Sequence, residues 1–188
     1  RNPWDVAYYA NLRAEEHFRL DQEELRRHFP LPRVLDGLFS LAERLYGIRV
    51  KEIPTRQSLS GTLAGESAGA VEVWHPDVRF FTIDDSNGDR LGSFYLDIFS
   101  RSNKRAGAWM NTLDTGSPST PETPGKPRLG MVCLNIHPPS AGDTVTLSHR
   151  EVRTLFHEFG HLLHLMFTRV SIPSLAGTSV PRDFVEVP

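Results

Sequence analysis

The start of the chain carries apolar side chains at helical spacing. An Asn-Pro pair opens it, which suits a helix start because asparagine caps free backbone amides and proline fits the first turn. We expect a helix over residues 3–18 and a short one over 21–28. An apolar residue then recurs every three or four positions over 32–46 until Gly47, a residue type that often ends helices. Residues 1–47 are therefore predicted to be helical.

The pattern changes at residue 48 to short runs of β-branched and aromatic residues, which are typical of strands. Two segments, 54–70 and 114–127, are rich in glycine, serine, threonine or proline and are predicted to be loops. An Asn-Gly pair at 87–88 predicts a tight turn between two strands. The predicted strands cover 48–53, 71–74, 78–83, 91–99 and 130–136. We expect an α+β fold in which helices flank a small sheet over residues 48–136.

A last helix is predicted over residues 148–168. Ser148 and Glu151 have the spacing of a capping box, in which the serine hydroxyl and the glutamate carboxylate satisfy free amides at the helix start. Apolar residues surround much of this segment, so the helix should be buried. It opens the third predicted region, residues 148–188, near the end of the chain.

Composition and charge exclude some classes of function. The chain has 188 residues, of which 39% are hydrophobic and 23% charged, as in an ordinary globular domain with one core. A formal net charge of −2 gives no basis for capturing nucleic acid or an anionic membrane surface. Cys133 is the only cysteine, so no internal disulfide can form, and no apolar run is long enough to span a membrane. We expect a protein of the cytoplasm.

The predicted last helix contains the motif His157-Glu158-x-x-His161. Residues four apart lie on one helix face about 6 Å from each other, so both imidazoles can point at one metal ion. Glu158 projects about 100° away and can reach a water molecule beside that ion. Zinc peptidases use this arrangement of two histidine ligands and a glutamate base. The opposing interpretation is a solvated helix face with two unconnected histidines, which the apolar surroundings disfavour because buried polar groups need partners.

A catalytic zinc ion usually has three protein ligands, and the motif leaves the third one open. His164 lies on the same face, but seven residues from His157 correspond to about 10.5 Å along the helix axis, too far to share one ion. We expect His164 to pack in the protein or to support a ligand. Asp183 and Glu186 are the carboxylates that follow the motif. The alternative for each is an exposed acidic residue, and spacing alone favours Glu186 only slightly.

Several segments together resemble the thimet oligopeptidase and oligopeptidase A family of zinc metallopeptidases, and within it the bacterial oligopeptidase A branch. They are W-D-V-A-Y-Y at 4–9, W-H-P-D-V-R-F-F at 74–81, G-S-F-Y-L-D at 92–97, K-R-A-G-A-W-M at 104–110, F-H-E-F-G-H at 156–161, G-T at 177–178 and D-F-V-E-V-P at 183–188. Nearly the whole chain is covered except 54–70, which looks longer. In that family a glutamate 25 residues beyond the second histidine completes the zinc site, and Glu186 holds that position here.

The resemblance implies a zincin-like partial catalytic domain in which His157, His161 and Glu186 hold one zinc ion and Glu158 is the general base. It implies a zinc-dependent endopeptidase that hydrolyses short oligopeptides. The tyrosine and histidine that stabilise the transition state in this family lie beyond the glutamate ligand. We therefore expect the 188 residues to be an internal fragment with little or no activity. The alternative is a non-catalytic zinc-binding module derived from such an enzyme, and retention of Glu158 favours the peptidase.

The apolar strand predicted over 130–136 could pair its backbone with a bound peptide if it lies at a sheet edge. An ordinary core strand is an equally good interpretation of the same residues. Beyond this strand, the sequence assigns no substrate-binding residue.

Overall fold

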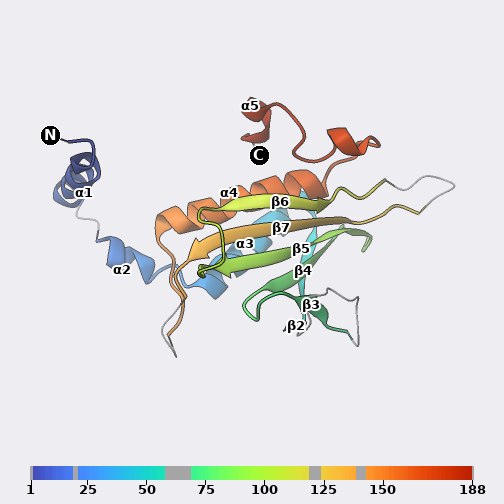
Figure 1. The fold of residues 1–188 in the computed structure, drawn as a ribbon, viewed down its shortest axis with the longest axis horizontal. Helices are drawn as coiled ribbons and strands as arrows, with labels where there is room; N and C mark the ends of the chain where they lie inside the picture. Colours follow the sequence, from blue (N-terminus) through green and yellow to red (C-terminus); the bar gives the residue numbers. More distant parts are fainter. Residues whose placement is uncertain (1, 19–20, 58–68, 119–123, 139–142, 188) are drawn as a thin grey trace.

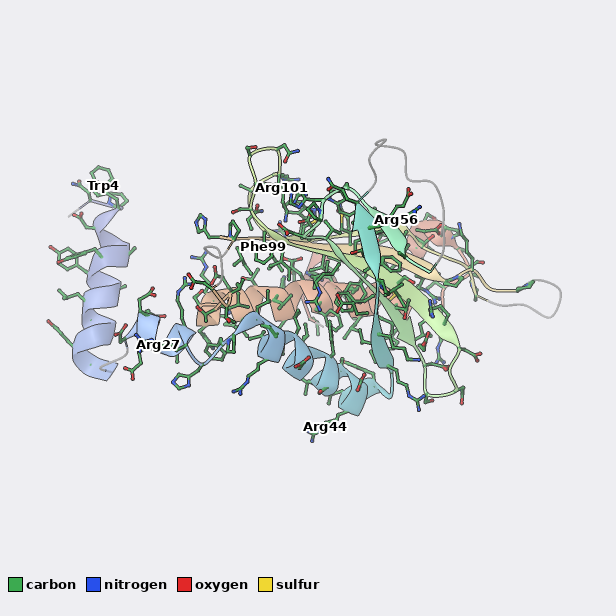
Figure 2. All side chains as sticks on the ribbon, turned by 90° about the horizontal axis from the view of Figure 1, so that it is seen from below. Trp4, Arg27, Arg44, Arg56, Phe99 and Arg101 are labelled. Atoms are coloured by element: carbon green, nitrogen blue, oxygen red, sulfur yellow. The ribbon has the colours of Figure 1, made fainter. Side chains whose placement is uncertain are left out.

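The computed structural model describes residues 2–18, 21–57, 69–118, 124–138 and 143–187. Its helices are α1 Asp5–Phe18, α2 Gln22–Arg26, α3 Leu31–Tyr46, α4 His149–Met166 and α5 Arg182–Val185, with a 3-10 turn at Pro173–Leu175. The four helices predicted from the sequence are confirmed, although α2 is shorter than expected. Figure 1 and Figure 2 both show α1 standing apart from the sheet. None of the described helices has the length and apolar character that a bilayer-spanning helix needs.

The main sheet has five strands in the order β1-β4-β5-β7-β6 (Figure 1). Only β5 and β7 run parallel to each other, and the other neighbours are antiparallel. The strands are β1 Arg49–Ile53, β4 Arg79–Asp84, β5 Arg90–Phe99, β6 Trp109–Asp114 and β7 Arg128–Ile136. A separate parallel pair joins β2 Thr55–Gln57 to β3 Val71–Val73. Helices and a mixed sheet together give the predicted α+β fold.

Some boundaries differ from those expected. β2 lies inside the predicted loop 54–70, and β7 begins two residues before the predicted strand. No strand was predicted where β6 lies. This strand runs along the edge of the sheet and its central residues are exposed, so it lacks the continuous apolar run of a buried strand. Residues 58–68 and 119–123 of the two predicted loops lie outside the described residues.

β7 is an inner strand of the sheet. It pairs with β5 on one side and with β6 on the other. The interpretation of residues 130–136 as an exposed edge is therefore wrong, and the core-strand interpretation is correct. Among the described strands, β6 forms this edge of the sheet, with β7 as its one neighbour.

An aromatic core joins α3 and α4 to one face of the sheet. Phe81 of β4 and Phe94 of β5 stack with their ring centroids 5.1 Å apart. Phe39 of α3 contacts both rings and also packs against Phe159 of α4, at a centroid distance of 5.7 Å. Burial of large aromatic side chains is a major favourable contribution to folding. The same cluster therefore stabilises the fold and fixes α4 on the sheet.

Two glycines allow α4 to approach the sheet closely. A Cβ atom at Gly130 of β7 would lie 2.5 Å from Cδ1 of Leu162, and one at Gly92 of β5 would lie 2.4 Å from Sδ of Met166. Because protein interiors are close-packed, no side chain fits there unless these neighbouring atoms shift. α4 consequently lies against β7 and β6, which brings the polar groups of its motif to the edge of the sheet.

Candidate metal centre and active site

α4 carries the predicted motif and begins with the predicted cap. The Ser148 hydroxyl accepts a hydrogen bond from the Glu151 N–H at 3.2 Å, and the Glu151 carboxylate accepts one from the Ser148 N–H at 2.7 Å. This capping box satisfies free amides at the helix start. The helix runs on to Met166, so His157 and His161 lie one turn apart on one face.

The chain after α4 turns back and brings Glu186 to the two histidines. Gly177 has a left-handed φ of 60° and packs on α4, where a Cβ atom would lie 2.9 Å from a leucine side chain. The short helix α5 follows and Glu186 ends it. The Glu186 carboxylate lies 3.2 Å from Nε2 of His157 and 3.8 Å from Nε2 of His161. The fold thus brings together the three predicted ligands.

These three groups fit a tetrahedral zinc site. The Nε2 atoms of His157 and His161 are 3.1 Å apart, and the ligand atoms of the two histidines and Glu186 all lie within 4.8 Å of one another. Ligand atoms bound to a tetrahedral zinc ion at ~2.0–2.1 Å would be about 3.3 Å apart, close to the separations found here. When each neutral imidazole carries its proton on Nδ1, the three converging atoms are all acceptors, and a cation satisfies them together.

His164 and Asp183 do not belong to this group of the described residues. The His164 ring packs near Phe184 with centroids 6.1 Å apart, which agrees with the expected packing role. The Nδ1 atoms of His161 and His164 are buried without a hydrogen-bond partner in the described part of the chain. A ligating histidine normally donates its second ring N–H to an acceptor, and the described residues offer His161 none.

Glu158 is buried beside the three converging groups. Burial raises the pKa of Glu158, and the negative charge of Glu186 adds to this effect, whereas His157, His161 and a hydrogen bond from the backbone N–H of Met110 lower it. Met110 belongs to β6, so the edge strand meets the carboxylate directly. A carboxylate in this position can accept a proton from a water molecule in the site.

Three hollows border α4 in the described part of the chain, and one of about 380 Å³ lies between the start of the helix and residues 134–136. Another of about 240 Å³ lies beside His157 and is also lined by Arg150, Arg153 and Thr154. A larger apolar hollow of about 510 Å³ lies at the C-terminal end of the helix next to His164. The larger hollow contains none of the three converging groups, so its size does not make it the site of the chemistry.

Two features of the site region were missed by reasoning from the sequence. One is β6, for which the W-M-N-T-L run at 109–113 was the available signal. The other is a buried ionic cluster around Asp97, whose partners come from separate segments that only the fold brings together. No local pattern in the sequence would have identified that cluster.

Comparison with known proteins identifies the family of the chain. Residues 1–188 match the family described as Peptidase family M3. The chain is 41% identical to Oligopeptidase A and 40% identical to Dipeptidyl carboxypeptidase, both of Escherichia coli (strain K12), each over 187 residues that make up 99% of this chain and 25% of the relative. It is 37% identical to the Probable cytosolic oligopeptidase A of Arabidopsis thaliana over 190 residues, 98% of this chain and 25% of that protein. The chain spans about a quarter of the length of these relatives. By a match over its whole length, the chain belongs to peptidase family M3.

Proposed function

We propose that these residues form part of the zincin-like catalytic domain of a cytoplasmic, zinc-dependent endopeptidase that hydrolyses short oligopeptides. His157, His161 and Glu186 would hold one zinc ion, and Glu158 would act as general base. The observation that carries the proposal is the convergence of three ligand atoms beside a buried glutamate. Family membership supports a peptidase, and the free, buried Cys133 suits a reducing compartment.

The chemistry follows from the positions of these groups. Zinc held by the three ligands would polarise the scissile carbonyl group and make a nearby water molecule more acidic. Glu158 takes the proton from that water and returns it to the leaving amine. The backbone N–H of Met110 donates to the same carboxylate and orients it toward the reacting water.

The edge strand β6 offers an extended peptide a place to bind. One side of β6 is paired with β7, and residues 111–113 are exposed. Backbone groups on the other side of an edge strand can pair with a peptide, as in strand-addition complexes. We propose that the substrate lies along β6, so that its scissile bond comes next to Glu158.

Further groups are proposed to come from outside the 188 residues, because the chain spans 25% of the length of its relatives. The resemblance implies that donors to the transition state lie beyond Glu186. Loss of one such donor can lower a rate by about 10²–10³. The 188 residues alone are therefore proposed to be inactive or very weak. Activity is to be measured on the longest natural polypeptide that contains them.

The alternative is a non-catalytic zinc-binding module that has kept the ligands of a peptidase. Structural zinc sites are normally closed by four protein ligands, whereas catalytic sites have three and an open position. Three converging groups are found among the described residues, and Glu158 lies beside them. Both features favour catalysis.

Glu158→Gln tests the proposed function directly. The substitution removes the base and keeps the size of the side chain, so zinc content should stay unchanged while hydrolysis of a quenched-fluorescent peptide falls by about 10²–10⁴. Glu23→Gln, on the exposed surface of α2, is the matched control and should change neither quantity. Full activity of Glu158→Gln would show that the proposed base is wrong. A wild-type protein that binds zinc and cleaves no peptide would favour the non-catalytic module.

A further inference from the structure

A buried ionic cluster lies where the chain leaves β5, near Phe99 and Arg101 (Figure 2). The Asp97 carboxylate is 2% exposed. Arg101 donates two hydrogen bonds to it at 2.8 and 2.6 Å, Lys104 donates one at 2.9 Å, and the Trp74 indole N–H donates one at 3.2 Å. The Asp97 carboxylate thus accepts hydrogen bonds from the loop after β5 and from the segment after β3.

Lys104 connects this cluster to two strands. Its side chain is 4% exposed, and its ammonium group also donates to the backbone carbonyls of Asp97 at 2.8 Å, Phe99 at 3.0 Å and Leu134. Asp97 and Phe99 lie at the end of β5, whereas Leu134 lies in β7. One lysine therefore ties the ends of two neighbouring strands to the loop that it belongs to.

Asn135 of β7 holds the other end of the same loop. Its side-chain amide donates to the carbonyl of Arg105 at 2.8 Å and to the carbonyl of Gly107 at 2.6 Å. Gly107 has a φ of 99°, a left-handed conformation that suits glycine. β6 starts two residues later, with Trp109 opposite Cys133. The loop is therefore held at both ends immediately before the edge strand begins.

The next residue of β6 is Met110, which packs against the core cluster that includes Phe159 of α4, and β6 lies against α4, the helix that carries Glu158. Contacts thus run from Lys104 and Asn135 through the loop to the strand that lies beside the helix of Glu158. We propose that Lys104 and Asn135 are positioning residues for peptide hydrolysis. They act by fixing the position of edge strand β6 relative to Glu158 and to the substrate backbone. This inference rests on the proposed function.

The first half of the test measures the strand and does not depend on activity. Lys104→Met removes the ammonium group and leaves Asp97 paired with Arg101. Asn135→Asp removes the two amide hydrogen bonds at almost constant size and covers the case in which Lys104→Met does not fold. In each folded variant, amide hydrogen exchange should become faster in residues 109–114. Lys51→Met, a change at an exposed lysine of β1, should leave it unaltered. Unchanged exchange in 109–114 would overturn the proposal.

The second half measures coupling to the substrate. N-methylation of a peptide nitrogen beside the scissile bond removes a donor to β6, so it should lower kcat/KM in the wild-type protein. Displacing β6 should lower kcat/KM for the normal peptide roughly ten- to a hundredfold at constant zinc content, and the added loss on N-methylation should shrink in Lys104→Met and Asn135→Asp. A merely structural role would leave that added loss at its wild-type size.

The outcomes separate the two proposals. If the wild-type protein cleaves peptides and the loss on N-methylation is equal in all variants, the role of Lys104 and Asn135 is contradicted while the proposed function stands. If the wild-type protein cleaves no peptide, the proposed function fails, and a positioning role in that reaction fails with it. In that case, faster exchange in 109–114 would show only that the cluster anchors the strand.

Discussion

The surroundings of Cys133 lower the reactivity of its thiol. It lies in β7 and is 2% exposed. Burial, reinforced by the negative charge of Asp97, raises the pKa of Cys133 to about 11. An ordinary cysteine has a pKa of about 8.5, and the thiolate is the reactive form. The position therefore predicts an unreactive thiol.

We expect Cys133 to resist thiol reagents at neutral pH. With the pKa at about 11, roughly one thiol in a thousand is ionised at pH 8, and that fraction rises about tenfold for each pH unit up to the pKa. Reaction with a chromogenic disulfide reagent should be slow in the native protein and fast after unfolding in guanidinium. Stoichiometric labelling of the native protein within seconds at pH 8 would contradict this environment.

The buried ion pair of Asp97 and Lys104 should contribute more to the free energy of unfolding than an ion pair on the surface does. Removing one partner of a buried ion pair commonly costs about 3–5 kcal/mol, because the other charge is left without compensation. Arg101 remains beside Asp97 when Lys104 is replaced, so the loss should lie at the lower end of that range. The free energy of unfolding of Lys104→Met should therefore be measured together with its hydrogen exchange and its kinetics.

Among the elements, α4 depends on close approach to the sheet. A Cβ atom at Gly92 would lie 2.4 Å from Sδ of Met166 and 2.7 Å from a backbone carbonyl oxygen, whereas one at Gly37 in the middle of α3 would meet nothing within 4 Å. The same substitution should therefore have opposite effects on stability at these two positions.

Gly92→Ala should lower the free energy of unfolding by about 1–3 kcal/mol, because a backbone atom cannot move aside for the new methyl group. Gly37→Ala should raise it by about 0.5–1 kcal/mol, because alanine loses less conformational entropy in a helix. Chemical denaturation of both variants beside the wild-type protein provides the comparison. Equal effects at the two positions would show that the surroundings of Gly92 are not as closely packed as described.

The elements differ in how far they could be predicted from the sequence. The helices α3 and α4 were predictable because apolar periodicity and local caps, such as Ser148 with Glu151, act within a few residues. β6 was not, because an exposed edge strand has little burial to shape its composition. The order of strands in the sheet, which makes β7 an inner strand and β6 the edge, depends on long-range pairing and left no local signal.

The site divides in the same way. His157, Glu158 and His161 were predictable because one helical turn determines their relative positions. The identification of Glu186 as a ligand required the family resemblance, because spacing alone favoured it only slightly over Asp183. Its position beside the histidines depends on how the chain folds back over α4. Met110 and Lys104 could not be found, because their roles arise where β6 and its preceding loop meet α4 and β7.

For the molecule as a whole, the sheet brings together groups that are far apart in the sequence. α4 supplies two histidines and the proposed base Glu158, the end of α5 supplies Glu186, and β6 lies against α4 beside them. The chain covers 25% of the length of its relatives in peptidase family M3. The site described here is therefore the metal-binding and proton-transfer part of the proposed reaction.

Zinc content tests this account most directly. Elemental analysis of the purified protein should find about one zinc ion per chain, as expected for a catalytic site with three protein ligands. The double variant His157→Ala/His161→Ala should bind none, because the remaining carboxylate cannot hold the ion alone. His28→Ala, at an exposed histidine outside the site, should keep the wild-type content. Equal zinc content in the wild-type protein and the double variant would contradict the account.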